Sequence, residues 1–277
     1  MGSVIRYSAQ AARSMDAMLV FDRTAVRRHR DRAAATIGSV EDLLRDAADR
    51  LLDRLDDMTG TFGVALDVGG RRVVAPLLRA RGITVVSSDL SLPMARMNGL
   101  PVVADEEFLP FAEGSFDLVV ASLSLHWIND LPGALIQLRR VLRPDGLFLA
   151  SMPALGTLAE LRAALTEAEL ALAGGASPRV SPFPDIPDCA GLLQRAGFSA
   201  PVVDVEEIVV RYADPLQMLR DLRAAGETNA VRARSRTAPS PQLFPAALAG
   251  MRGNDGRVPL TLRLAMMTGW AGAMRDR

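Results

Sequence analysis

The sequence predicts an α/β fold with a doubly wound parallel sheet, and two observations lead to this prediction. Residues 62–152 form repeated β–α units whose strand segments are continuous apolar runs, as is typical of strands buried on both faces. The first of these runs ends in Asp67 and is followed by Gly69, Gly70 and a helix-like segment. This order brings backbone N–H groups close to a small-molecule cofactor, and glycine lets the ligand approach the backbone.

Each element is expected where an apolar run or a helical period is bounded by turn residues. A helix capped by Ser39, with Asp42 three residues later, precedes the sheet. A turn at 143–146, with Gly146 at positive φ, leads into the fifth strand. The expected strands are 63–68, 83–88, 100–103, 117–122 and 147–152, and the helices between them are 73–80, 92–97 and 132–141.

The pattern changes after Pro153, where the regular alternation of strands and helices ends. The expected order is helix 155–173, an irregular proline-rich segment 177–187, helix 189–196, strand 202–210, helix 215–225, helix 244–251 and a final strand 258–268. The chain therefore divides into a tail (1–20), an N-terminal helical arm (21–60), a cofactor-binding core (61–152) and a C-terminal part of the same domain (153–277) with a helical insertion at 212–257.

Composition limits the function. The 277 residues carry a formal net charge of zero, which argues against non-specific nucleic-acid binding. Cys189 is the single cysteine, which excludes a disulfide framework and a cysteine-based metal site. No apolar run approaches the roughly 18 residues of a membrane span, so we expect at most peripheral membrane association. The expected setting is a bacterial cytoplasm, with the mitochondrial matrix as alternative because Arg and Ser recur near the N-terminus.

Three residues are candidates for binding or catalysis from their type and spacing. Asp89 ends the second apolar run 22 residues after Asp67, roughly where nucleotide-binding folds place an acid on ribose hydroxyls; the alternative is a helix N-cap or a loop acid. Asp67 either orients the glycine turn or reaches a cofactor amino group through water, unless the N–H groups of the turn satisfy it. His126 is a candidate base, or alternatively a residue of the pocket wall.

Several motifs resemble those of the class I S-adenosylmethionine-dependent methyltransferases (methyltransferase type 11). They are L-D-V-G at 66–69, S-D-L-S at 88–91, A-D-E at 104–106, F-D-L-V at 116–119 and L-R-P-D-G at 142–146. The resemblance implies a Rossmann-like seven-stranded sheet with an antiparallel last strand and helices on both faces. It also implies that S-adenosylmethionine is bound by Asp67, Gly69, Gly70, Asp89, Leu90, Asp105, Glu106 and Ser122. Asp105 would accept from the adenine amino group, unless it is a solvated loop acid.

Three further segments resemble the branch that contains the complex I assembly factor 5 proteins and the malonyl-carrier-protein methyltransferases of biotin synthesis. They are F-D-R at 21–23, L-H-W-I-N-D-L-P at 125–132 and D-L-R-A-A-G-E-T-N-A at 221–230. One departure concerns the usual G-x-G-x-G motif, whose second and third glycine positions hold Arg71 and Val73. Their side chains occupy space near the methionine end of the cofactor, although Arg71 is also able to pair with its carboxylate.

The resemblance implies three functions. The first is an enzyme that uses S-adenosylmethionine and modifies a protein side chain, by hydroxylation of an arginine in an iron–sulfur subunit of respiratory complex I. The second is a non-catalytic assembly chaperone whose degenerate glycine turn has lost the cofactor. The third is a carboxyl O-methyltransferase of an acyl carrier protein in biotin synthesis, for which a basic docking patch is available from Arg27, Arg28, Arg30 and Arg32.

Overall fold

A computed structural model describes residues 19–58, 60–253 and 255–272. Most of the predicted tail, residues 1–18, lies outside the described residues. No helix in the described part of the chain is long and apolar enough to cross a membrane.

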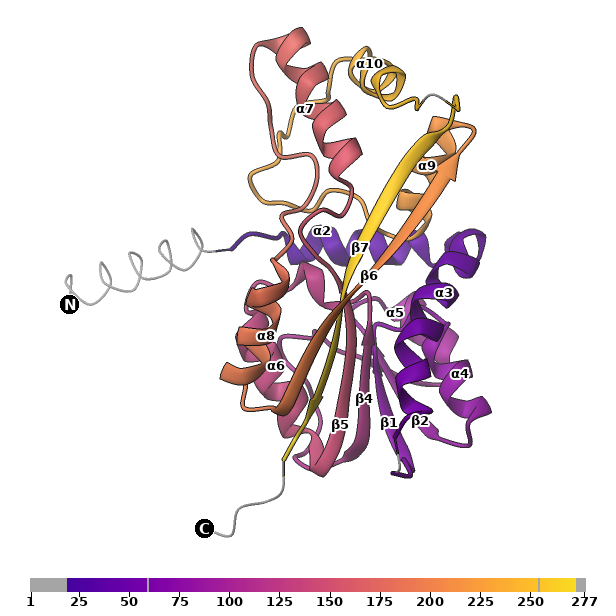
Figure 1. Ribbon diagram of the computed structural model, residues 1–277, viewed down its shortest axis with the longest axis vertical. Coiled ribbons are helices and arrows are strands. Elements are labelled where there is room, and N and C mark those ends of the chain that lie inside the picture. Colours follow the sequence, from indigo (N-terminus) through magenta and orange to yellow (C-terminus); the bar gives the residue numbers. More distant parts are fainter. Residues whose placement is uncertain (1–18, 59, 254, 273–277) are drawn as a thin grey trace, which may run out of the picture.

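Seven strands form one sheet in the order β3-β2-β1-β4-β5-β7-β6 (Figure 1). Within it β7 runs antiparallel to both β5 and β6, while the other described pairs are parallel, which confirms the predicted fold. The strands are β1 (Val64–Val68), β2 (Thr84–Asp89), β3 (Leu100–Val103), β4 (Phe116–Ser122), β5 (Leu142–Pro153), β6 (Ser199–Tyr212) and β7 (Val258–Trp270). The strand order reverses between β1 and β4, where doubly wound sheets open a ligand crevice at the carboxyl ends of their strands.

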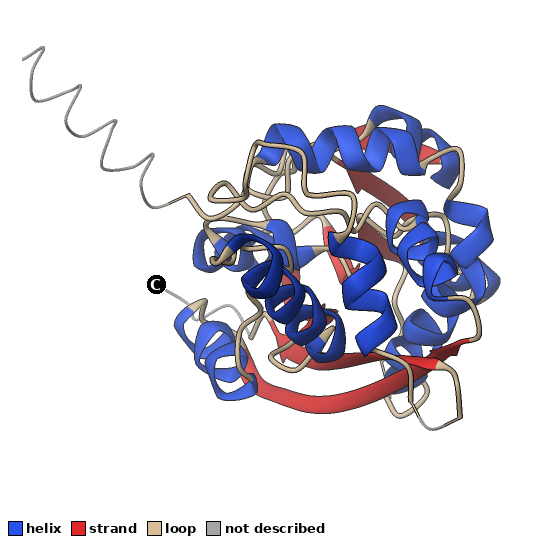
Figure 2. Cartoon of the chain, turned by 90° about the horizontal axis from the view of Figure 1, so that it is seen from above, coloured by secondary structure: helices blue, strands red, loops and turns tan. Residues whose placement is uncertain are grey.

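Helices cover both faces of the sheet (Figure 2). On one face α3 (Glu41–Leu52) and α4 (Val74–Ala80) share a hydrophobic core with Ala65 of β1. On the other face α6 (Leu131–Arg140) and α8 (Ile186–Arg195) share a second core with Leu66. Successive side chains of a strand point to opposite faces, so the apolar run of β1 serves both cores. The short α5 (Leu92–Ala95) follows β2.

Three helices pack at the far end of β6 and β7, which extend beyond the rest of the sheet (Figure 1). They are α7 (Ala159–Ala173), α9 (Pro215–Ala224) and α10 (Leu243–Gly250). They enclose a third hydrophobic cluster that includes Met218, Leu248 and Leu260. This C-terminal cap, made of α7, α9 and α10, stands over the carboxyl edge of the parallel strands.

Helix α2 (Arg23–Ala33) crosses the carboxyl edge between the sheet and the C-terminal cap (Figure 1). Asp22 caps it by accepting a hydrogen bond from the N–H of Ala25 (3.0 Å). The same residue joins α2 to the chain after α9: its N–H donates to the carbonyl of Ala230 (2.8 Å), and Arg234 donates to its carboxylate (2.9 Å). Phe21 also forms an isolated antiparallel bridge with Val231. Two segments distant in sequence are therefore fastened together above the sheet.

Some element boundaries differ from the predictions. Ser39 does not cap α3: the helix begins at Glu41 after a 3₁₀ turn (Ile37–Val40), and the Ser39 hydroxyl donates to the carbonyl of Thr36 (2.9 Å). Helix α7 begins at Ala159 rather than 155, because Gly156 and Leu158 take φ values of 103° and 56° that interrupt a helix.

The turn before the fifth strand also differs. Asp145 takes the positive φ (59°) that was expected of Gly146. Gly146 is needed for space instead, since a Cβ there would lie 2.9 Å from the carbonyl oxygen of Arg143. The turn is incorporated into β5, which begins at Leu142. The final strand continues two residues past the predicted end at 268, and α8 begins within the expected irregular segment, at Ile186.

Candidate functional site

The glycine turn after β1 keeps a left-handed backbone at Arg71, one of the two substituted glycine positions, whereas Val73, the other, takes φ −99°. Gly69 takes φ 64°, and the next residues at positive φ are Arg71 (46°) and Arg72 (63°). A left-handed conformation costs a residue with a Cβ on the order of 1–2 kcal/mol. A Cβ on Gly69 would lie 2.8 Å from the Cβ of Ser124, so this position must stay glycine. The turn is therefore preserved at the expense of strain at two arginines.

Asp67 lies beneath this turn and is fully buried. Its carboxylate accepts a hydrogen bond from Ser87 (3.3 Å), while Oδ1 has no hydrogen-bond partner. A Cβ on Gly70 would overlap this carboxylate, which explains the glycine. Burial, followed by the negative charge of Asp89, raises the pKa of Asp67 to about 7. The side chain thus supports the turn from below and does not face a cation directly.

Asp89 ends β2 at the same edge and is 2% exposed. Its Oδ1 accepts from the N–H of Ser91 (2.7 Å), and its Oδ2 is buried without a hydrogen-bond partner. The N-cap of α5 is Ser91, whose hydroxyl accepts from the N–H of Met94 (3.3 Å), so Asp89 does not serve as that cap. Burial raises the pKa of Asp89 despite the opposing charge of Arg30. Leu90 packs with the apolar residues of α2 and Trp127.

Two arginines of α2 meet the acids that end β2 and follow β3. Arg30 is 2% exposed, and its Nη1 lies 2.5 Å from Glu106 Oε1 and 3.6 Å from Asp89 Oδ1. Arg23 pairs with Asp105 (2.5 Å) and with Glu106. Burial alone would raise the pKa of Glu106, but Arg30 and Arg23 lower it to about 2. We call these residues the edge cluster: Arg23, Arg30, Asp89, Asp105 and Glu106.

The guanidinium of Arg30 also lies over the glycine turn. Its Nη2 donates to the carbonyl of Ser124 (3.3 Å), and its Nη1 would be 3.7 Å from a Cβ on Gly69. Three polar atoms around this point are buried without a hydrogen-bond partner: Arg30 Nε, Asp89 Oδ2 and Ser124 Oγ. Buried polar groups are nearly always paired, so unpaired ones in one place indicate room for a polar ligand or ordered water.

Ser122 and His126 lie on the other side of the turn from these acids. Ser122 ends β4, and its hydroxyl is 3.3 Å from that of Ser151 on β5. His126 lies in a 3₁₀ turn (Leu125–Trp127), with Nε2 2.7 Å from Glu227 Oε2 and Nδ1 buried without a partner. Nε2 therefore faces a carboxylate of the chain.

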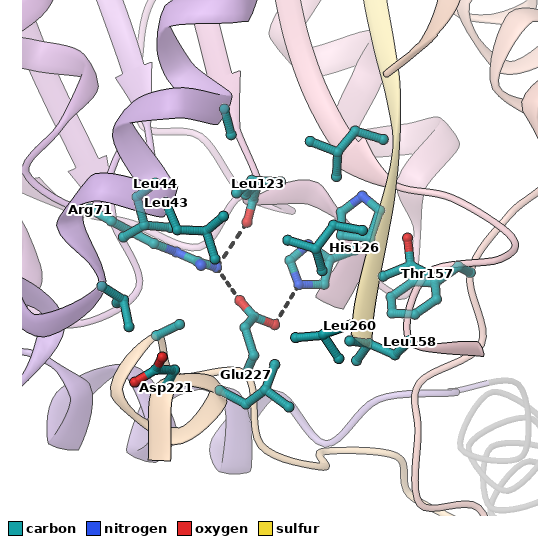
Figure 3. A pocket seen from close by; sticks show the side chains of 18 of the residues that line it. Leu43, Leu44, Arg71, Leu123, His126, Thr157, Leu158, Asp221, Glu227 and Leu260 are labelled. Carbon is teal, nitrogen blue, oxygen red and sulfur yellow. Dashed lines mark hydrogen bonds and ion pairs between the residues drawn. The ribbon is translucent and has the colours of Figure 1, made fainter. Parts of the chain in front are cut away.

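Glu227 collects three donors, and Figure 3 shows two of them, Arg71 and His126. Trp127 Nε1 donates to Oε2 (2.9 Å), next to His126 on the same oxygen, and Arg71 donates to Oε1. Arg71 also donates to the carbonyl of Leu123 (2.8 Å) and is 4% exposed. Burial would raise the pKa of Glu227, but His126 and Arg71 lower it well below its ordinary value. We call Arg71, His126, Trp127 and Glu227 the inner cluster.

The inner cluster borders a small cavity beneath the C-terminal cap. The cavity has a volume of about 80 Å³, and its wall is mostly apolar, with Leu44, Leu158, Leu260 and Leu262 around the polar groups (Figure 3). A wider cleft of about 430 Å³ lies between α7, α9 and α10. Leu222 and Glu227 line both spaces, so Glu227 lies at the junction between the cavity and the cleft.

The structure assembles the site from residues that the sequence pointed to and from others that it did not. The predicted acids Asp89, Asp105 and Glu106 meet at one edge, next to the glycine turn. The pairing of Arg23 and Arg30 with them was missed, although the run of arginines at 23–32 and the three acids at 105–107 were its visible signals.

Comparison with known proteins identifies the family of this chain. The family described as Methyltransferase domain matches residues 66–150. A zebrafish protein named arginine-hydroxylase NDUFAF5, mitochondrial, is 43% identical over 93% of this chain and 84% of its own length. The human protein of that name is 38% identical over 95% of this chain and 80% of its own. A malonyl-[acyl-carrier protein] O-methyltransferase of Laribacter hongkongensis is 37% identical over 92% of each chain.

By family and fold the chain belongs to the class I S-adenosylmethionine-dependent methyltransferases. Within that class it belongs to the family of the NDUFAF5 arginine hydroxylases and the malonyl-[acyl-carrier protein] O-methyltransferases. Solved structures share the fold at low identity. The YcgJ protein of Bacillus subtilis has a TM-score of 0.55 at 13% identity, covering 80% of this chain and 97% of its own. Phosphoethanolamine N-methyltransferase 2 of Haemonchus contortus, in complex with S-adenosylhomocysteine, has a TM-score of 0.52 at 17% identity, covering 89% and 60%.

Proposed function

We propose that this protein binds S-adenosylmethionine at the edge cluster and modifies an arginine side chain of a protein during assembly of respiratory complex I. The observation that carries the proposal is the group of unpaired buried atoms beside the glycine turn: Arg30 Nε, Asp89 Oδ2 and Ser124 Oγ. The likeness to arginine hydroxylases along nearly the whole chain supports the arginine as the acceptor. The partner is then a protein, an iron–sulfur subunit of complex I, and not a nucleic acid.

The residues at the carboxyl edge fit the cofactor. Asp89 has a free carboxylate oxygen for a ribose hydroxyl, and Asp105 and Glu106 continue the acidic edge. Arg30 and Arg71 both keep an unpaired Nε–H, and Arg30 is the one whose guanidinium lies beside Gly69, where the cofactor's carboxylate would be held. When bound, the cofactor would supply an activated sulfonium methyl group, which suffices for methylation of the acceptor, whereas hydroxylation would in addition need an oxygen donor and a two-electron oxidant. The low polarity of the adjoining cavity excludes water from the acceptor.

Two observations bear on the alternatives. The positive φ values of Arg71 and Arg72 favour the assembly chaperone, since a strained, substituted turn is what loss of the cofactor would leave. The third function, an acyl-carrier-protein methyltransferase, needs a basic docking patch. Arg30 cannot be part of that patch because it is buried against Glu106, but three exposed arginines remain for it: Arg27, Arg28 and Arg32. The family supports this third function through its malonyl-[acyl-carrier protein] O-methyltransferases. We propose that the protein acts in a bacterial cytoplasm or in the mitochondrial matrix. These two compartments lie on corresponding sides of the respiratory membrane.

Calorimetric titration of the full chain with S-adenosylmethionine tests the proposal. We expect saturable binding, a thermal stabilisation of about 2.7 kcal/mol at a hundredfold excess over the dissociation constant, and at least tenfold weaker binding in Asp89→Asn. The control is Asp57→Asn, an exposed acid in the helical arm, which should bind like the wild type. Absence of binding at millimolar cofactor would contradict the hypothesis of a cofactor-dependent enzyme. If the gene still restored complex I activity to cells that lack it, the hypothesis of a non-catalytic assembly chaperone would replace it.

A further inference from the structure

Arg71 places a guanidinium in an apolar cavity, although it belongs to a turn that would be less strained with glycine. Its side chain is 4% exposed and reaches the carbonyl of Leu123 (2.8 Å) and the carboxylate of Glu227. Proteins accommodate an arginine side chain by burying its methylene stem against apolar surface and pairing its planar head with a carboxylate. The position of Arg71 therefore outlines a pocket that suits an arginine.

Glu227 is oriented for this role without help from Arg71. Trp127 and His126 both contact Oε2, at 2.9 and 2.7 Å, so the rotation of the carboxylate is fixed and Oε1 is presented to the cavity. The carbonyl of Leu123, a residue held at φ 52°, provides a second acceptor on the same side. Together the two oxygens form a receptor for one planar guanidinium, which carries five N–H donors.

Arg71 fills this receptor incompletely. Both of its hydrogen bonds come from Nη2, and its Nε is buried without a partner. A guanidinium binds a carboxylate most strongly when two parallel N–H groups engage it, and Arg71 does not make that arrangement. Because Arg71 approaches from the glycine turn, its stem direction is set by the turn and not by the receptor. An arginine that enters from another direction is free of that constraint.

Such a direction exists, since Glu227 lies at the junction of the inner cavity and the wider cleft between α7, α9 and α10. The side chain of Glu227 is 19% exposed, which makes it accessible from the cleft. Leu222, which also lines both spaces, offers apolar surface at the junction for the methylene stem of an incoming side chain.

We propose that Glu227 and the carbonyl of Leu123 form the arginine-binding site for the acceptor protein, and that Arg71 fills this site until the acceptor's arginine replaces it. The proposal rests on the proposed function in taking a protein arginine as the ligand. Replacement exchanges one guanidinium for another, so Glu227 keeps a cationic partner throughout, and Arg71 is released at the glycine turn.

The test uses capped arginine, N-acetyl-L-arginine N-methylamide, as the probe, with the capped lysine and guanidinium chloride as comparisons. Binding is measured by NMR titration and by thermal shift on the full chain, without cofactor. Arg71→Met should bind capped arginine at least tenfold more tightly than the wild type and should prefer it to capped lysine at least tenfold. Arg71→Met combined with Glu227→Gln should lose this gain. The matched control is Arg143→Met, which breaks a pair with Asp117 at the opposite end of the sheet and should change nothing.

A merely structural Arg71–Glu227 pair gives a different result. In that case guanidinium ion would restore the thermal stability of Arg71→Met as well as capped arginine does, or capped lysine would bind equally, and either outcome overturns the proposal. If Arg71→Met does not fold, Arg71→Gln retains an amide donor for Glu227 and carries the same expectations. Titration of the same variants with S-adenosylmethionine separates the two proposals. If the variants bind capped arginine but not S-adenosylmethionine, only the proposed function is contradicted. If they bind S-adenosylmethionine but not capped arginine, only the arginine-binding site is contradicted.

Discussion

The edge cluster and the inner cluster both bury an arginine against a carboxylate, but they differ in their balance of charge. In the edge cluster two arginines face Asp89, Asp105 and Glu106, and the carboxylate of Glu107 is 3.8 Å from Arg23. In the inner cluster Arg71 and His126 face one glutamate, and the neutral indole of Trp127 supplies a further donor. Acidic side chains outnumber basic ones in the first cluster, and basic side chains outnumber the single acid in the second. The difference indicates that removing one cation should cost more free energy of unfolding in the edge cluster than in the inner cluster.

The largest expected effect is that of Arg30→Met. Removing this guanidinium leaves Glu106 and Asp89 buried without their principal cation, and breaking a buried pair from one side typically costs about 3–5 kcal/mol. Chemical unfolding measures the loss. The matched control is Arg28→Met on the exposed side of the same helix, expected within about 0.5 kcal/mol of the wild type. Equal effects in the two variants would show that the buried pairing of Arg30 with Glu106 and Asp89 does not stabilise the fold.

A second prediction concerns Asp67, which lies under the turn between the two clusters and forms no ion pair with any described residue, although the charge of Arg79 acts on it from further away. Its pKa is raised from 3.8 to about 7, so in the native state it stays protonated where the unfolded chain is ionised. Its contribution to stability is therefore complete below pH 4 and is lost as the pH rises to 7, a loss of up to about 4 kcal/mol. Asp67→Asn should lack this loss. Urea unfolding between pH 4 and 8 measures it, and parallel profiles for the two proteins would contradict the assignment.

The smallest effect is expected for Arg72→Gly. Arg72 shares the left-handed backbone of Arg71, but its side chain is exposed and forms only a surface pair with Glu41 (3.5 Å). Relief of about 1 kcal/mol of strain is offset by the lost pair and by the greater freedom of glycine in the unfolded chain. A net stabilisation below about 1 kcal/mol is expected from thermal unfolding. A clear destabilisation would show that Arg72, like Arg71, holds a partner that matters.

The strands and the acids at their ends were predictable, and the partners of those acids were not. Asp67 and Asp89 each end a continuous apolar run, so local pattern places them at the carboxyl edge. Arg30 reaches Glu106 across 76 residues, and Arg71 reaches Glu227 across 156, distances over which a single sequence carries no pairing information. The sequence suggested that Arg71 pairs with the carboxylate of the cofactor. The structure supplies a carboxylate from the chain itself instead. Ser39 failed as a cap because a 3₁₀ turn, which the capping pattern does not foresee, moved the helix start to Glu41.

Hydrogen bonds from Asp22 to Ala230 and from Arg234 to Asp22 connect the N-terminus of α2 to the segment that follows Glu227. Gly226, at φ 79°, packs against Ala33 of the same helix, which adds a second point of attachment. Lifting α2 to admit a molecule at the edge cluster therefore pulls on the loop that holds Glu227. Access to the edge cluster and access to the Glu227 site are therefore coupled through α2. A kinetic scheme in which the two ligands bind in a fixed order follows from this coupling more directly than one in which they bind independently and in random order.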